Sequence, residues 1–259
     1  MTTSGPSSRN LAAIPAPARL REMLRAYAAL DILLLPDFNS RSFFFVAKWG
    51  KHQLATCRGF NGGWFLVLFT GPDAAVIKGF DPESPMSPEN RPKGRRWPHL
   101  FDGIPSDMVR VKNSRAYVRR DVTYCLWHPP GGTWTMGPVQ FPAGMADPDG
   151  SGAHLKMLDD KPESYLQFAI DDHRKKKVSL AAVKRVCAGE PLTWAMVSKL
   201  ALDDHAAVVV KELEETGYPI TKSLLRKARA DEAARDPFEL LYRKSDQEGQ
   251  MGGSPSHRP

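Results

Sequence analysis

Two acidic residues follow a hydrophobic run at a spacing that suits acid–base or metal chemistry. Asp81 and Glu83 are two residues apart in the stretch GFDPES, so in an extended chain their carboxylates point to the same side. With His99 or Asp102 returning nearby, they could hold a hard cation or act as a general acid–base pair. The alternative is structural, because Asp81 and Ser84 could accept hydrogen bonds from backbone amides in a proline-rich turn.

Cations stand beside an aromatic ring a few residues later. The run KGRRWP places Arg95 and Arg96 next to Trp97. Single-strand nucleic-acid binders use this combination for phosphate contacts and base stacking. Arg also stacks on Trp in ordinary loops, and both residue types are frequent anchors of protein–protein interfaces. We find no Walker loop, zinc finger or RNA-recognition consensus, so a protein partner is favoured over a nucleic acid.

A third stretch resembles part of a calcium loop. Residues 147–152, DPDGSG, match the first six positions, with Asp147 and Asp149 as ligands. The twelfth position requires a bidentate Glu, and Leu158 stands there. The favoured interpretation is a tight polar turn, with Asp147 and Asp149 as weak metal candidates.

Common catalytic motifs are missing from the sequence. There is no Gly-x-Ser-x-Gly elbow and no glycine-rich loop before a helix. Cys125 and His128 are three residues apart in one expected strand, so their side chains fall on opposite faces. We therefore predict no cofactor and favour a non-enzymatic protein, while enzymatic activity stays open.

The elements around these residues predict an α+β fold. Apolar residues recur at three- and four-residue steps from Leu20 to Leu34, which predicts an N-terminal helix that ends at Pro36. The apolar run at residues 64–69 has no polar face, so it predicts a central strand that is covered on both sides. From Pro162 onward the periodicity is helical. We expect an antiparallel sheet, a meander of hairpins, with an N-terminal helix and a C-terminal helical group.

Three hairpins account for the strands. Turn-forming residues separate the two strand-like runs of each hairpin. The paired runs are residues 42–49 with 51–58, 64–69 with 74–80, and 121–128 with 133–136.

The expected organisation is one domain between two irregular ends. Residues 1–17 are rich in Ser, Pro and Ala without a period, which predicts a disordered leader. Residues 18–220 form the α+β domain, with a sheet part at 40–142 and a helical part at 160–220. The polar residues 221–259 are expected as a partly disordered tail.

The positive charge is concentrated in one stretch. The chain of 259 residues has a net charge of +7, and residues 91–120 hold nine Lys or Arg against two Asp. This stretch therefore accounts for the whole excess. A local basic patch indicates an acidic partner, either a protein or a nucleic acid.

Composition indicates a protein of the reducing cytoplasm. The three cysteines are far apart and form no Cys-x-x-Cys pair, which argues against a disulfide framework. No apolar run approaches the roughly 18 residues that span a bilayer, and the N-terminus lacks a signal-peptide pattern. We expect no association with a membrane.

Residues 79–88 (GFDPESPMSP), Trp97-Pro98 and the DGIP at residues 102–105 together resemble a family of uncharacterised bacterial proteins. The resemblance spans about residues 40–220 and implies no established activity. The family pattern has His where this chain has Pro82, which weakens a metal or acid–base role at that position. Such families often occur beside bacterial toxins, so the resemblance implies an immunity-type protein.

Three functional hypotheses follow. The first is a cytoplasmic bacterial protein that binds another protein with an acidic surface, such as a toxin, through residues 81–102 and the adjacent basic patch. The second is a metal-dependent hydrolase or nuclease with catalytic candidates Asp81, Glu83, His99 and Asp102. The third is a nucleic-acid binder that uses residues 91–120.

Overall fold

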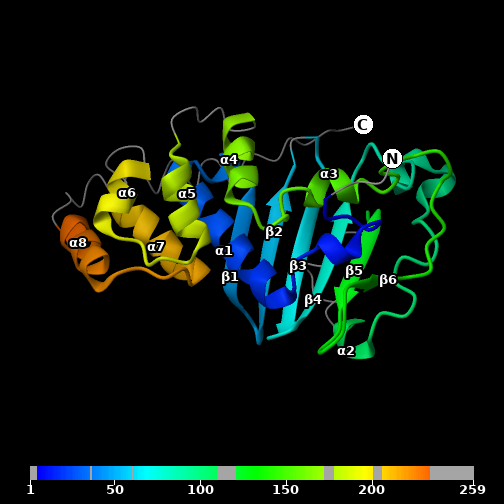
Figure 1. The fold of residues 1–259 in the computed structure, drawn as a ribbon, viewed down its shortest axis with the longest axis horizontal. Helices are drawn as coiled ribbons and strands as arrows, with labels where there is room; N and C mark the ends of the chain where they lie inside the picture. Colours follow the sequence, from blue (N-terminus) through cyan, green and yellow to red (C-terminus); the bar gives the residue numbers. More distant parts are fainter. Residues whose placement is uncertain are drawn as a thin grey trace, which may run out of the picture.

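The computed structural model describes residues 5–35, 37–59, 61–109, 121–171, 178–200 and 206–233. It contains a long N-terminal helix, one six-stranded antiparallel sheet and a group of C-terminal helices (Figure 1). The α+β class predicted from the sequence is confirmed.

The sheet is a meander in which each strand pairs with the next one along the chain. This order, β1 to β6, keeps all pairings local and antiparallel, as the hairpin pattern predicted. The strands are β1 (Phe43–Trp49), β2 (His52–Arg58), β3 (Trp64–Gly71), β4 (Ala74–Phe80), β5 (Tyr124–His128) and β6 (Thr135–Met136).

The third strand is a central one. β3 lies between β2 and β4, and its first six residues are buried on both faces of the sheet. On one face Phe65 and Val67 join the main core. On the other face Trp64, Leu66 and Leu68 form a second cluster with Leu54 and Phe80. The absence of a polar face in the sequence is explained by burial of both faces.

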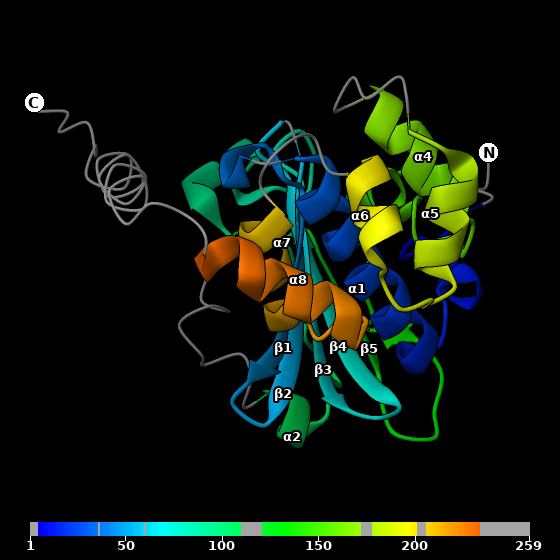
Figure 2. The same cartoon turned by 90° about the vertical axis from the view of Figure 1, so that its left-hand side faces the viewer.

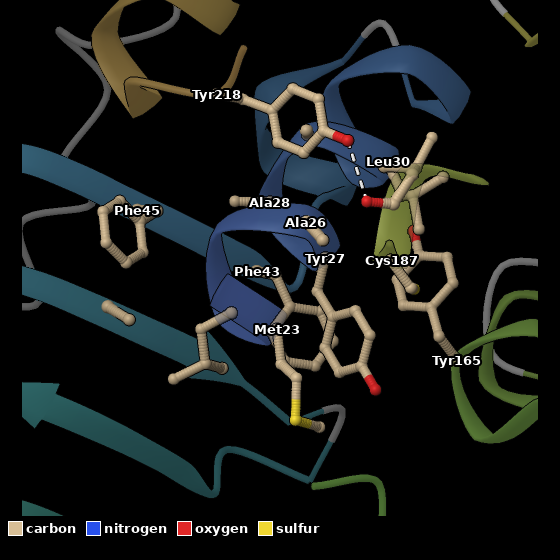
Figure 3. Close-up of a cluster of buried hydrophobic side chains, with 14 of the residues drawn as sticks. Met23, Ala26, Tyr27, Ala28, Leu30, Phe43, Phe45, Tyr165, Cys187 and Tyr218 are labelled. Carbon is tan, nitrogen blue, oxygen red and sulfur yellow. Dashed lines mark hydrogen bonds between the residues drawn. The ribbon is translucent and has the colours of Figure 1, made fainter. Parts of the chain in front are cut away.

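Helix α1 (Pro17–Leu34) supplies the main core. Pro17 occupies its first turn, where the missing N–H costs no hydrogen bond. Tyr27 packs against Phe43 of β1 with ring centroids 5.3 Å apart, and against Tyr165 at 5.0 Å (Figure 3). Because these aromatic residues come from three elements, α1 joins the sheet to the helical group.

Among the described residues, five helices follow the sheet and a short connecting helix α3 (Ser151–Leu155). Figure 2 shows α1, α4, α5 and α6 on one side of the sheet. Tyr218, which follows α7, donates a hydrogen bond to the Val186 carbonyl of α5 (2.8 Å) and so links two helices (Figure 3). The helices are α4 (Pro162–Asp171), α5 (Leu180–Cys187), α6 (Trp194–Leu200), α7 (Ala206–Thr216) and α8 (Lys222–Ala233).

The other face of β4 and β5 is covered by an irregular stretch. Met108 of the short helix α2 (Ser106–Val109), with Phe101 and Ile104, packs against Val76 and Trp127 of these strands. Phe101, Ile104 and Met108, at and beyond the end of the predicted 81–102 segment, therefore belong to a third hydrophobic cluster.

The expected leader is wrong for residues 5–17. Ser8 is buried and its amide donates to the Ser151 hydroxyl (2.9 Å), while Trp134 donates its indole N–H to the Pro15 carbonyl (2.9 Å). Ile14 is buried in the main core. Long-range hydrogen bonds stabilise this stretch, and such bonds leave no periodic pattern in the sequence. Its composition alone therefore did not reveal that it is ordered. The expected tail is ordered at its start, where α8 forms, and residues 234–259 lie outside the described residues.

No helix among the described residues is long and apolar enough to cross a membrane.

Candidate functional site

The predicted segment begins where β4 ends, and its first acid has a structural role. The Asp81 amide donates to the Thr123 hydroxyl (3.1 Å), and Asp81 Oδ1 accepts from the Glu83 amide (2.9 Å). Ser84 donates to the Pro148 carbonyl and accepts from the Met86 amide. This is the backbone-capping turn that was the structural alternative for Asp81 and Ser84.

His99 and Asp102 form a separate exposed pair. His99 Nδ1 lies 2.7 Å from Asp102 Oδ2, and more than half of each side chain is exposed. His99 has a positive φ of 63°, and its carbonyl lies so close to Gly137 that a Cβ at that glycine would collide with it. The backbone of His99 and Asp102 therefore lies close against a second loop at Gly137, while their side chains stay exposed.

The four acid–base candidates do not converge. Across the described ranges, no group of three or more His, Cys, Asp or Glu residues is placed to hold a metal ion. Asp81 with Glu83 and His99 with Asp102 are two local pairs. The structure brings together neither the predicted metal set nor a shared acid–base centre.

The cations of the segment lie on a loop that is braced from inside. We call residues 91–97 the cationic loop. The Arg91 guanidinium donates to the carbonyls of Arg95 (3.0 Å) and Arg96 (2.7 Å) and lies over the Trp97 ring at 4.7 Å. Trp97 in turn donates its indole N–H to the Gln140 carbonyl (3.0 Å). Arg91 and Trp97 thus fix the backbone that presents Arg95 and Arg96.

The remaining cations of the loop are exposed. Lys93, Arg95 and Arg96 all face solvent, and Arg96 lies over the Phe101 ring at 4.9 Å. In the part of the chain that the structure describes, no carboxylate pairs with any of these three cations or with Arg91. The loop therefore presents unneutralised positive charge. The basic residues at positions 110–120 lie outside the described residues.

Asp147 and Asp149 are turn residues, as the favoured interpretation held. Asp147 accepts from the amides of Gly152 (2.9 Å) and Ala153 (2.8 Å) at the start of α3, and Asp149 accepts from the Ser151 amide and hydroxyl. Burial raises the pKa of Asp149 to about 6. Both carboxylates accept hydrogen bonds from backbone and hydroxyl donors, as residues of a tight polar turn do.

A pair formed by a buried tyrosine and a half-buried histidine was missed from the sequence. The Tyr124 hydroxyl lies 3.2 Å from His154 Nδ1, with the two rings 6.0 Å apart. Burial raises the pKa of Tyr124 well above its usual value and lowers the pKa of His154, although Asp81 and Asp147 oppose the shift of His154. Both side chains are therefore neutral at neutral pH.

Three glycines make room for this pair and its acidic neighbour. A Cβ at Gly79 would collide with the Tyr124 ring, its cross-strand partner, and a Cβ at Gly150 would collide with Asp81. A Cβ at Gly63 would lie 2.6 Å from His154 Nε2. Glycine inside a strand can mark such a close approach, and Gly79 was the available sequence signal.

The ring of His154 lines a cavity of about 450 Å³. The cavity lies between the end of β2, the start of β3, and the chain from α3 to α4; Figure 1 shows α3 and α4 near the same end of the sheet. None of the residues predicted as a site from the sequence lines it.

In comparisons with known proteins, no family model, no curated protein and no solved structure matches the chain.

Proposed function

We propose that this chain is a binding protein that docks the acidic surface of another protein through the cationic loop. The single observation behind the proposal is four cations, Arg91, Lys93, Arg95 and Arg96, on one internally braced loop without a carboxylate partner among the described residues. Complementary charge accelerates encounter and selects the partner. A braced loop also loses little conformational entropy when it binds.

A protein partner fits this loop better than a single-stranded nucleic acid. Base stacking requires a free aromatic face. One face of Trp97 is covered by Arg91, its N–H bonds the main chain, and it packs beside the buried Met86 and Leu100. Trp97 therefore supports the loop, and the exposed arginines make the contacts.

A further cation approaches from the N-terminal segment. Arg9 lies over the Phe141 ring at 5.0 Å, and Phe141 packs on the same hydrophobic cluster as Trp97. Arg9 also donates to the Met145 carbonyl (2.8 Å). Segments far apart in the sequence thus add positive charge on this side of the molecule.

The immunity-type role, with a toxin as the acidic partner, is the specific form of this proposal. We place the protein in the cytoplasm because Cys57, Cys125 and Cys187 are all buried and form no Cys-x-x-Cys pair, which suits a reducing compartment.

Charge-reversal variants with a matched control test the loop. R95E/R96E changes the net charge by four units, and K48E/K51E makes the same change at two exposed lysines beside the β1–β2 turn. Each variant and the unmodified protein is titrated with poly-L-glutamate and with a single-stranded oligonucleotide of equal charge, at two salt concentrations.

We expect R95E/R96E to weaken poly-L-glutamate binding about tenfold more than K48E/K51E does, with the difference shrinking at high salt. Equal weakening by both variants would show that only net charge matters and would overturn the proposal. Tighter, loop-dependent binding of the oligonucleotide would replace it with the nucleic-acid hypothesis.

A further inference from the structure

A second candidate site lies in the cavity beside His154, away from the cationic loop. Its volume of about 450 Å³ falls within the range of small-molecule pockets. No residue of the cationic loop lines it, so its function is independent of the proposed protein binding.

The walls of the cavity are apolar and aromatic. Phe65 and Met157 are buried in the main core, and Phe168 packs against the same core. Such walls bind an apolar body by removing its surface from water.

His154 supplies a directed hydrogen-bond donor to this apolar space. The Tyr124 hydroxyl is buried, and within the described residues its hydrogen-bond partner is His154 Nδ1. If Nδ1 carried the proton, the buried hydroxyl would have no acceptor for its own hydrogen. The hydroxyl therefore donates to Nδ1, and the neutral imidazole holds its proton on Nε2.

The Nε2–H group has no hydrogen-bond partner within the described ranges, and the side chain of His154 is half-buried. A Cβ at Gly63 would lie 2.6 Å from this nitrogen, so the glycine lets the edge of the ring lie close to the main chain. A ligand in the cavity that brings an acceptor oxygen would satisfy the Nε2–H group.

The positive charge of Lys156 favours a carboxylate as the acceptor group of the ligand. Lys156 lines the same cavity, is exposed, and has no carboxylate partner in the described part of the chain. Asp171, the carboxylate among the lining residues, already accepts from Gln167 (2.8 Å). A hydrogen bond to a charged acceptor is stronger than one to a neutral acceptor, which favours an anionic oxygen at Nε2.

We propose that the cavity binds a small monocarboxylate with an apolar or aromatic body. The carboxylate accepts from His154 Nε2 and pairs with Lys156, while the body lies against Met157 and Phe168.

Isothermal titration with 2-naphthoate and with the uncharged 2-naphthylmethanol tests this site. Ala153→Phe fills the cavity from an exposed lining position, and Ala181→Phe makes the same change at an exposed alanine of α5 that does not line it. His154→Phe keeps a ring and removes the donor. Thermal unfolding of each variant confirms that it is folded.

We expect saturable binding of 2-naphthoate that Ala153→Phe abolishes, Ala181→Phe leaves unchanged, and His154→Phe weakens about tenfold. We expect 2-naphthylmethanol to bind about tenfold more weakly than 2-naphthoate. No saturable heat with either compound at millimolar concentration would overturn the proposal. So would equal affinities in Ala153→Phe and Ala181→Phe, or equal affinities for the two compounds.

Discussion

Asp31 in the last turn of α1 gives the protein a pH-dependent stability that can be calculated. The carboxylate is fully buried, and it accepts from the Tyr165 hydroxyl (2.6 Å) and from the amides of Ser42 and Phe43 (2.8 Å each). It therefore joins α1 to α4 and to the start of β1. Despite these hydrogen bonds, burial raises its pKa from 3.8 to about 6.

The sign of the effect follows from the raised pKa. The folded protein binds the Asp31 proton more tightly than the unfolded chain does, so protonation of this group stabilises the fold. The stabilisation is absent above about pH 7 and grows as the pH falls through the folded value of about 6 toward the unfolded value of 3.8. With these two values, linkage gives about 2 kcal/mol between pH 7.5 and pH 4.5.

Urea unfolding of the unmodified protein and of Asp31→Asn at several pH values isolates this effect. The variant is nearly isosteric and cannot titrate, and the other groups of the chain are common to both proteins. We expect the stability difference to shift toward the unmodified protein by about 2 kcal/mol between pH 7.5 and pH 4.5. A difference that stays constant with pH, or that shifts the other way, would refute the reasoning.

Three further changes test parts of the structure. Gly79→Ala should lower the free energy of unfolding by at least about 2 kcal/mol because the new Cβ collides with Tyr124. Gly71→Ala, whose Cβ makes only an ordinary contact, should not lower it by this amount, and chemical unfolding measures both variants. Asp147→Ala should lower the free energy of unfolding by about 1 kcal/mol because the amides at the start of α3 lose their acceptors. Calcium should leave the Tm of the unmodified protein unchanged, and a rise in Tm with calcium would support the calcium site instead. Trp97→Phe should cost no more than about 1 kcal/mol, measured as a small drop in Tm, because it removes one exposed hydrogen bond and keeps the packed ring; a much larger loss would contradict this supporting role.

The sheet was predictable because its pattern is local. Each hairpin has its own turn, and the run that begins at Trp64 is apolar on both faces, which predicts a central strand. Helix α1 was equally clear from its apolar period, but its polar Asp31 was not interpreted. The acceptor role of that residue depends on Tyr165, which is 134 positions away in the sequence.

The candidate site was only partly predictable. The basic residues of the loop could be read from the sequence. The hydrogen bonds by which Arg91 stabilises the loop backbone could not, because they depend on how that backbone folds around the Arg91 side chain. The pairing of Tyr124 with His154 joins a strand to a short helix 30 residues later, and a lone His signals no such contact. Glycines such as Gly79, which leave room for a close contact, were the sequence feature that could have indicated the Tyr124–His154 pair.

Zero-length cross-linking in an extract of the native cells tests the central claim most directly. A carbodiimide joins a lysine amine to a carboxylate in contact, and Lys93 is the amine of the cationic loop. We predict a partner protein cross-linked to Lys93 through an Asp or Glu, recovered with the unmodified chain and with K48E/K51E, and lost with R95E/R96E. Recovery of the same partners with all three proteins, or cross-links that never involve the loop, would contradict the account.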